Sequence, residues 1–305
     1  MTPAEEPLVD AHQHFWDLSL GKHPWLCAPL SIPFRYGDYA RLRETYLPPD
    51  YLRDSNGFNV VKSVYVDAEW DPDDPIGETR WVGELREQHG YPHAMVAQAW
   101  LDRDDVQDVL AAQSEFDFVR GVRQKPAAAH APYAPHPGPR SSMSDEKWRR
   151  GYALLERFGL SFELQVAHWH LPEAAVLARD FPGTQIILNH TGLPYDRSEA
   201  GLSHWREAMR TLAAEPNVAL KISGLGMANL PWSVDRQRDI VLDAIGIFGV
   251  ERCMFASNFP VDGLAGDFST VMGGYGSIVA DFPAAQRRKL FHDNAVKFYR
   301  LDDEN

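Results

Sequence analysis

Two histidines stand one residue apart near the start of the chain, in the segment VDAHQHFWD at residues 9–17. The apolar residues before them predict a β-strand, and the side chains of a strand alternate between its two faces. Asp10, His12 and His14 are therefore expected on one face, with neighbours about 7 Å apart at ~3.3 Å per residue. On a polar face that lines a pocket, the two imidazoles could bind one metal ion or one substrate.

Polar side chains also stand at or just beyond the ends of the later apolar runs. After the second to fifth runs, the candidates are Asp67, Glu69, Trp100, Arg123, Lys125, Gln165, His168, Trp169 and His170. After the sixth to eighth runs, they are Asn189, His190, Lys221, Ser223, Ser257 and Asn258, with Asp262 four residues later. Each alone has an ordinary explanation, such as a hydrogen-bonded structural histidine, a solvated cation or a packed tryptophan. Together they indicate one site, because buried polar groups without partners are costly.

The elements that must position these residues alternate along almost the whole chain. Short apolar runs rich in β-branched residues predict strands at 8–14, 59–68, 92–100, 118–124, 160–167, 184–190, 217–223 and 252–258. Apolar residues at spacings of three and four predict helices near 78–89, 103–116, 145–159, 172–181, 203–215, 233–249 and 284–299. Strands joined by such crossovers predict an α/β fold, a single (β/α)8 TIM barrel domain over residues 1–305.

A doubly wound open sheet is the main alternative to the barrel. Such a sheet usually carries a glycine-rich phosphate turn after its first strand, and neither GxGxxG nor GxxxxGK[ST] occurs in the sequence. The barrel is therefore favoured. It would bring the polar strand ends to one carboxyl-terminal face, where barrel enzymes build their active sites.

Two connections, after the first and the fourth strand, are too long for simple loops. The first spans about 15–58 and contains several tryptophans and tyrosines, and the second is KPAAAHAPYAPHPGPRSSM at 125–143. Each follows a strand and is expected at the carboxyl-terminal face. For the second connection, a lid or pocket wall is favoured over a disordered linker at 126–142.

The composition is that of a globular protein, with 44% hydrophobic and 24% charged residues and a formal net charge of −13. This acidity argues against nucleic acid and anionic membranes as partners, because no basic patch is present to displace counterions. The first ten residues lack the basic and apolar regions of a signal peptide, and no apolar run approaches the ~18 residues of a membrane span. Cys27 and Cys253 form no CxxC pair, which favours a reducing cytoplasm. The expected partner is a small-molecule substrate. The sequence leaves open whether the chain forms a homo-oligomer.

The chain resembles the amidohydrolase-related branch of the amidohydrolase superfamily, which includes sugar-acid lactonases and pyrone-dicarboxylate lactonase. The similarity extends over nearly the whole sequence in family order, through DAHQHFWD, HPWL, YLPPDYL, GETRW, VRGVRQ, LNHTGLP, PNVALKISGL and RCMFASNFPVD. The resemblance implies a (β/α)8 fold and hydrolysis of a small carboxylated or polyhydroxylated lactone. It also implies that His12 and His14 are metal ligands, and that His190 is a further ligand or polarises the substrate carbonyl. At most one divalent ion is expected, with zinc favoured, and action without a metal stays open.

The end of the eighth expected strand departs from the family pattern. Relatives commonly have Ser-Asp-Trp-Pro there, and this chain has SNFP at 257–260. The amide of Asn258 cannot act as a general base and is a poorer ligand for a dication than a carboxylate. Glu69 and Asp262 are the candidate replacements, and Glu69 is favoured because a strand end is held more rigidly than a loop.

The combined expectation is a lactone hydrolase. A metal ion or His190 would polarise the carbonyl group, and a carboxylate or a histidine would activate water. The residues expected to bind the substrate are Arg123, Lys221, Gln165, His168, Trp169, His170 and Trp100. Three rivals stay open: a decarboxylase of the same superfamily, a metal-independent lactone isomerase, and a small-molecule-binding protein on an inactive barrel, which Asn258 would favour.

Overall fold

Eight parallel strands form the centre of the protein and pair in sequence order, β1 to β8, in a computed structural model that describes residues 6–29, 31–127 and 140–301. The strands are β1 (Leu8–Gln13), β2 (Val60–Val66), β3 (Ala94–Gln98), β4 (Val119–Arg123), β5 (Ser161–Leu164), β6 (Ile186–Leu188), β7 (Val218–Ile222) and β8 (Cys253–Phe255). Backbone hydrogen bonds join the segment after β8 to β1, from Asn258 N to His12 O and from His14 N to Phe259 O, both 2.8 Å. The sheet thus closes into a barrel, and the predicted (β/α)8 fold is confirmed.

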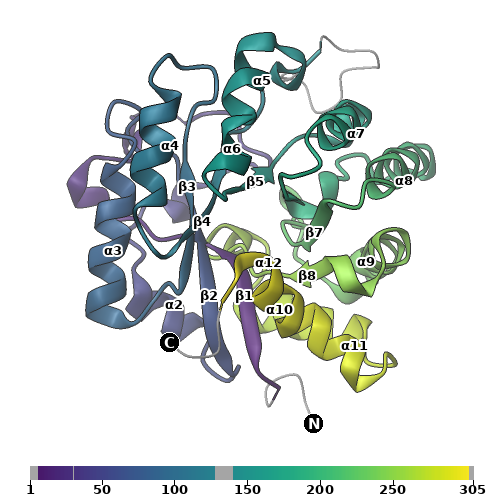
Figure 1. The fold of residues 1–305 in the computed structure, drawn as a ribbon. Helices are drawn as coiled ribbons and strands as arrows, with labels where there is room; N and C mark the ends of the chain where they lie inside the picture. Colours follow the sequence, from purple (N-terminus) through teal and green to yellow (C-terminus); the bar gives the residue numbers. More distant parts are fainter. Residues whose placement is uncertain (1–5, 30, 128–139, 302–305) are drawn as a thin grey trace.

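Helices surround the strands as a ring (Figure 1). Those that follow β2 to β6 are α3 (Gly77–His89), α4 (Val106–Ser114), α5 (Glu146–Tyr152), α6 (Leu154–Arg157), α7 (Leu171–Asp180) and α8 (Glu199–Ala213). Those that follow β7 and β8 are α9 (Val234–Phe248), α10 (Phe268–Ile278), α11 (Ala284–Arg288) and α12 (Asn294–Tyr299). Local capping explains several starts: Asp145 accepts a hydrogen bond from Trp148 N, and Asp267 accepts one from Thr270 N.

The structure differs from the expected helices in three places. The helix expected at 145–159 is divided into α5 and α6, and the one expected at 284–299 is interrupted by a π-helix at Lys289–Asp293. Helix α10 was not expected, because its sequence FSTVMGGYGSI contains three glycines, which lower helix propensity. Packing compensates for this, since a Cβ atom at Gly274 would lie 2.1 Å from the Trp232 ring.

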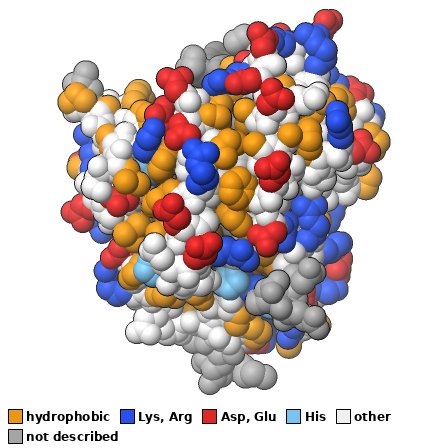
Figure 2. All heavy atoms as spheres, turned by 60° about the vertical axis from the view of Figure 1, so that its left-hand side comes forward, with side chains coloured by type: hydrophobic (Ala, Val, Ile, Leu, Met, Phe, Trp, Pro, Cys, Tyr) orange, Lys and Arg blue, Asp and Glu red, His pale blue; other side chains and the backbone are white. Residues whose placement is uncertain are grey.

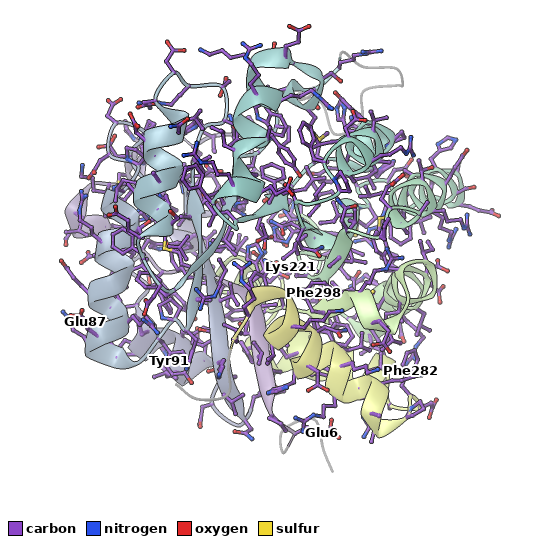
Figure 3. All side chains as sticks on the ribbon, viewed as in Figure 1. Glu6, Glu87, Tyr91, Lys221, Phe282 and Phe298 are labelled. Carbon is purple, nitrogen blue, oxygen red and sulfur yellow. The ribbon has the colours of Figure 1, made fainter. Side chains whose placement is uncertain are left out.

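The barrel interior is apolar at its amino-terminal end and polar above it. In β7, Ala219 belongs to the interior cluster, whereas Leu220 and Ile222 pack outward against the helices. Lys221 also points inward and forms an ion pair of 3.0 Å with Glu163, and Figure 3 shows it near the middle of the barrel. Helix α12 covers the amino-terminal end, where the Tyr299 hydroxyl donates a hydrogen bond to Glu163.

The connection between β1 and β2 contains two short helices, α1 (Pro24–Cys27) and α2 (Pro48–Asp54), and packs at the carboxyl-terminal end of the barrel. Its aromatic side chains contact one another: the ring centroid of Trp25 lies 5.8 Å from that of Phe34 and 5.7 Å from that of Tyr39. The long connections expected after the first and fourth strands are both present. The lid or pocket wall expected at 125–143 falls mostly on residues 128–139, outside the described residues.

On the face shown in Figure 2, acidic and basic side chains are interspersed, with apolar side chains between them. In the described ranges, no helix is both long enough and apolar enough to cross a membrane.

Candidate active site

A pocket of about 240 Å³ opens at the carboxyl-terminal end of the barrel. Eight of the residues expected in the site line it: His14, Asp67, Glu69, Arg123, Lys125, Gln165, His190 and Asn258. They come from the ends of β1, β2, β4, β5, β6 and β8. The connection between β1 and β2 supplies one wall, through Trp25, Phe34 and Arg35. The pocket is therefore built in the way that barrel enzymes build their active sites.

Three imidazoles converge at the floor of this pocket. The ring centroid of His12 lies 4.8 Å from that of His14 and 4.8 Å from that of His190. The Nε2 atoms of His12 and His14 are 3.1 Å apart. His12 is fully buried beneath the pocket lining, whereas His14 and His190 reach the pocket.

Hydrogen bonds assign the protons on His12 and His14. His14 Nδ1 lies 2.7 Å from Val66 O, an acceptor, so Nδ1 carries a proton and Nε2 is unprotonated in the neutral ring. His12 Nε2 must then donate to His14 Nε2, which leaves His12 Nδ1 as an acceptor. Lys221 Nζ, which only donates, lies 3.4 Å from that Nδ1. This series of hydrogen bonds, from Lys221 through His12 and His14 to Val66, therefore engages every ring nitrogen of both histidines.

The surroundings keep the three histidines neutral. Burial, followed by the positive charge of Lys221, holds the pKa of His12 well below its ordinary value. Burial and the charge of Arg123 do the same for the pKa of His14. For His190, burial and the charge of Arg35 lower the pKa well below the ordinary range. Both effects act by disfavouring the charged imidazolium.

His190 differs from the other two histidines in having a nitrogen available. Its Nδ1 lies 3.1 Å from Ser223 Oγ. Within the described residues, Nε2 of His190 has no hydrogen-bond partner, and the side chain lines the pocket. If Nδ1–H donates to Ser223, Nε2 presents a lone pair to a substrate or a water molecule.

Asp10 does not lie with the histidines, contrary to the expectation of one shared face. Its carboxylate accepts hydrogen bonds from the Tyr51 hydroxyl and the Ser257 backbone N, both at 2.8 Å. The pairing of β1 with β2 shifts register between Asp10 and Gln13, so the simple alternation of faces fails there. Asp10 thus connects β1 to the connection that follows it and to the end of β8.

Arg123 is held by an ion pair inside the pocket wall. Its Nε donates to Asp67 Oδ1 at 2.6 Å, its Nη2 donates to Asp67 O, and its Nη1 donates to Gln165 Oε1 at 3.2 Å. Arg123 and Asp67 are both buried. The guanidinium is therefore rigid and keeps one hydrogen on each terminal nitrogen for a ligand. Asp67 had no role assigned from the sequence, and the structure makes it the residue that orients Arg123.

Glu69 lies at the rim and is paired with Lys125. The side chains of this pair are 40% and 44% exposed. The charge of Lys125 lowers the pKa of the Glu69 carboxyl, so the carboxylate is ionised at neutral pH. The Glu69 carboxylate can accept a proton from a substrate or a water molecule, but the ion pair with Lys125 competes for its oxygens.

Asn258 and Asp262 form a buried pair rather than two separate site groups. Asn258 Nδ2 donates to Asp262 Oδ1 at 2.7 Å, and the Tyr36 hydroxyl donates to the same oxygen. Gly224 N donates to the other oxygen at 3.2 Å. Asp262 is fully buried, and burial raises the pKa of its carboxyl. Asp262 thus orients the amide of Asn258, which reaches the pocket, and does not itself line it.

Three pocket residues have a left-handed backbone that non-glycine residues rarely adopt. The φ angles are 58° for Glu69, 53° for His190 and 55° for Asn258. All three follow strand ends, at β2, β6 and β8, and all three line the pocket. Such conformations cost of order 1–3 kcal/mol each and cluster at functional sites. Their coincidence in one pocket supports a functional role and could not be read from the sequence.

The structure places the remaining candidates outside the lining of this pocket. Lys221 lies below it, in contact with His12. Trp100 lines a neighbouring hollow that shares Glu69 and Arg123 with the main pocket. The segment His168–His170, with Trp169 in it, forms a single-turn helix, where His170 Nδ1 lies 3.3 Å from a Glu173 oxygen. Tyr195 lines the pocket without having been expected there.

The donor set is not that of a complete metal site. A metal ion at His12 and His14 would need the lone pairs of both Nε2 atoms, but the hydrogen-bond chain protonates one and engages the other. The position after β8 offers the Asn258 amide in place of a carboxylate. Among the residues that the structure describes, no group of three His, Cys, Asp or Glu side chains could hold a metal ion. With these hydrogen bonds, the two histidines do not present the pair of Nε2 lone pairs that a metal ion would need.

The sequence matches a family model described as Amidohydrolase over residues 9–301. It is 44% identical over 299 residues to the uncharacterized protein y4mH of Sinorhizobium fredii, with 96% of this chain and 98% of that protein covered. It is 26% identical to an L-fucono-1,5-lactonase of Burkholderia multivorans, with 97% of this chain and 96% of the relative covered. The crystal structure of an amidohydrolase from Burkholderia multivorans with bound zinc is similar with a TM-score of 0.80 at 25% identity, and the match covers 97% of this chain and 99% of that one.

Proposed function

The chain belongs to the amidohydrolase family, and from this membership we propose that it hydrolyses the ring ester of a small lactone. The observation that carries the proposal is the pocket that brings neutral His190 together with the rigid cation Arg123. The relative from Burkholderia multivorans named L-fucono-1,5-lactonase supports the reaction class.

In the proposed reaction, His190 acts as the general base. Its Nε2 takes a proton from a water molecule, whose oxygen attacks the lactone carbonyl carbon. The charge that develops on the carbonyl oxygen is stabilised by hydrogens of Arg123 and of the Asn258 amide. The ring C–O bond then breaks, and His190 returns the proton to the leaving alkoxide, which gives a hydroxy acid.

Neighbouring side chains hold the three reacting groups in position before a substrate binds. Asp67 fixes Arg123, Asp262 fixes Asn258, and the Ser223 hydroxyl orients His190. Oriented donors of this kind stabilise developing charge because they need little reorganisation when the reaction occurs. Glu69 is the second candidate for the base, since its carboxylate is ionised and lines the same pocket.

The zinc in the Burkholderia multivorans structure raises the question of a metal in this chain. A divalent ion would supply a Lewis acid to the carbonyl oxygen or lower the pKa of water. The ring nitrogens of His12 and His14 are engaged in hydrogen bonds, and Asn258 supplies no carboxylate. We therefore propose that this chain's own residues carry out the hydrolysis without a bound metal.

A pH-indicator assay over a panel of sugar-acid and aromatic-acid lactones tests the proposed function. We expect acid release on at least one lactone, and its loss in His190→Asn. Release of carbon dioxide would instead identify a decarboxylase. Conversion of the lactone into an isomeric lactone, without release of acid, would identify a lactone isomerase. Tight binding of a lactone without turnover would identify a binding protein.

A further inference from the structure

The cations near the pocket differ in whether a carboxylate neutralises them. Arg123 pairs with Asp67 at 2.6 Å, and Lys221 pairs with Glu163 at 3.0 Å. Lys125 pairs with Glu69 in the same way. In the described part of the chain, Arg35 forms no ion pair. Its direct contacts are neutral: Nη1 donates to Gly224 O at 2.7 Å, and the guanidinium lies 4.5 Å from the ring centroid of Tyr36. The buried Asp262 carboxyl is close enough for the charge of Arg35 to act against the rise of its pKa, but it forms no ion pair with Arg35.

A second arginine that has no acidic partner in the described ranges, Arg197, lies close by. Among the residues that the structure describes, Arg197 has two long hydrogen bonds, both 3.4 Å, to Gln237 Oε1 and to Leu225 O. Its Nε is buried and has no hydrogen-bond partner among the described residues. Burial, with a smaller contribution from the charge of Arg35, lowers the pKa of Arg197 to about 10, so it remains charged at neutral pH.

Arg35 and Arg197 line one cavity of about 170 Å³, and none of its described lining residues is acidic. Arg35 and Tyr195 also line the main pocket, so the cavity adjoins it. Because Gly224 has no side chain, Arg35 in the cavity and His190 in the main pocket can both lie close to its backbone. A Cβ atom there would lie 2.6 Å from Arg35 Nη2 and 2.5 Å from His190 Nδ1. A group bound by Arg35 would therefore lie beside the proposed base.

We propose that Arg35 and Arg197 form an anion subsite that binds a carboxylate of the substrate. This inference rests on the proposed lactone hydrolysis and narrows the substrate class to lactones that carry a carboxylate. Two guanidinium groups in one cavity repel each other, and an anion bound between them would offset this repulsion. Their planar donors suit a carboxylate. Arg123 is less suited to this role because Asp67 already neutralises it.

The test compares two lactones that differ in one carboxylate: a glucarate monolactone and the neutral gluconolactone of the same ring size. The variants are Arg197→Gln and Arg35→Gln, with Arg197→Lys as a second form that keeps the charge. Arg210→Gln on the exposed face of α8 is the matched control. We expect the wild type to prefer the carboxylated lactone, and Arg197→Gln to lower the ratio of kcat/KM values about tenfold or more. Arg197→Lys should keep part of the preference, and Arg210→Gln all of it.

Equal kcat/KM losses on both lactones in Arg197→Gln would overturn the subsite. A second measurement separates this result from a failure of the proposed function. If the wild type hydrolyses neither lactone, calorimetry with the open-chain acids glucarate and gluconate still tests the subsite. Tighter binding of glucarate, lost in Arg197→Gln, would support the subsite even though the lactonase proposal had failed. Equal binding of both acids to the wild type would overturn it.

Discussion

Lys221 Nζ lies 3.4 Å from Nδ1 of His12, deep in the barrel, and this contact sets the protonation of the histidines above it. Lys221 is itself paired with Glu163 and has no exposed surface. Burial lowers the pKa of Lys221 to about 8, so the ammonium form still dominates at neutral pH. With Lys221 as the donor, His12 Nε2 carries a proton and is not available to bind a metal ion.

The first prediction follows from this contact. Protein treated with a chelator and then dialysed should keep its lactonase activity within about twofold of the untreated enzyme, because no step of the proposed reaction requires a metal. Metal analysis of the treated protein and the initial rate are the measurements. A loss of activity that zinc restores stoichiometrically would show that His12 changes its tautomer to bind the metal.

The second prediction concerns pH. Burial and the charge of Arg35 lower the pKa of His190 below the ordinary value of 6.5, so its neutral, basic form persists into acidic solution. A base acts only when it is unprotonated, so the acid limb of the kcat/KM profile should lie below pH 6.5. An acid limb at or above that pH, with the protein still folded, would contradict the assignment.

The third prediction separates the two candidate bases. His190→Asn removes the imidazole and should lower kcat by about 10²- to 10⁴-fold, the range for general acid–base catalysis. His204→Asn, on the exposed face of α8, is the control and should have no effect. Glu69→Gln should cost no more than about tenfold, since the proposed base remains. A larger loss in Glu69→Gln than in His190→Asn would make Glu69 the base.

The fourth prediction concerns Arg123. Arg123→Lys keeps the charge but loses the fork that contacts Asp67 twice and Gln165 once. We expect kcat/KM to fall about tenfold or more, equivalent to roughly 1.4 kcal/mol of transition-state stabilisation. Steady-state kinetics on the best lactone measures this. Unchanged kinetics would exclude Arg123 from the chemistry.

The fold could be predicted because its signal is repeated along the chain. Each strand is a short apolar run, and each main helix has apolar residues three and four apart, so the alternation survives errors in any one element. Helix α10 was missed because glycines obscure its pattern, and one of them, Gly274, lets the helix pack closely against Trp232. Local propensity cannot report such tertiary contacts.

The candidate site could be predicted only in part. Residues at strand ends, such as His190 and Arg123, reach the pocket because barrel geometry brings them there. Asp10 was assigned to the wrong face because a register shift in β1 interrupts the alternation. Arg35 was missed because it lies in a connection without periodicity, and only the folded chain places it beside His190.

The most direct test of lactone hydrolysis is the fate of the water oxygen. The best lactone is converted in oxygen-18-labelled water, and the product is analysed by mass spectrometry. We expect one heavy oxygen in the carboxylate of each product molecule with the wild-type enzyme, and product formation reduced at least about a hundredfold with His190→Asn. A product formed by the wild type without heavy oxygen would contradict hydrolysis at this site.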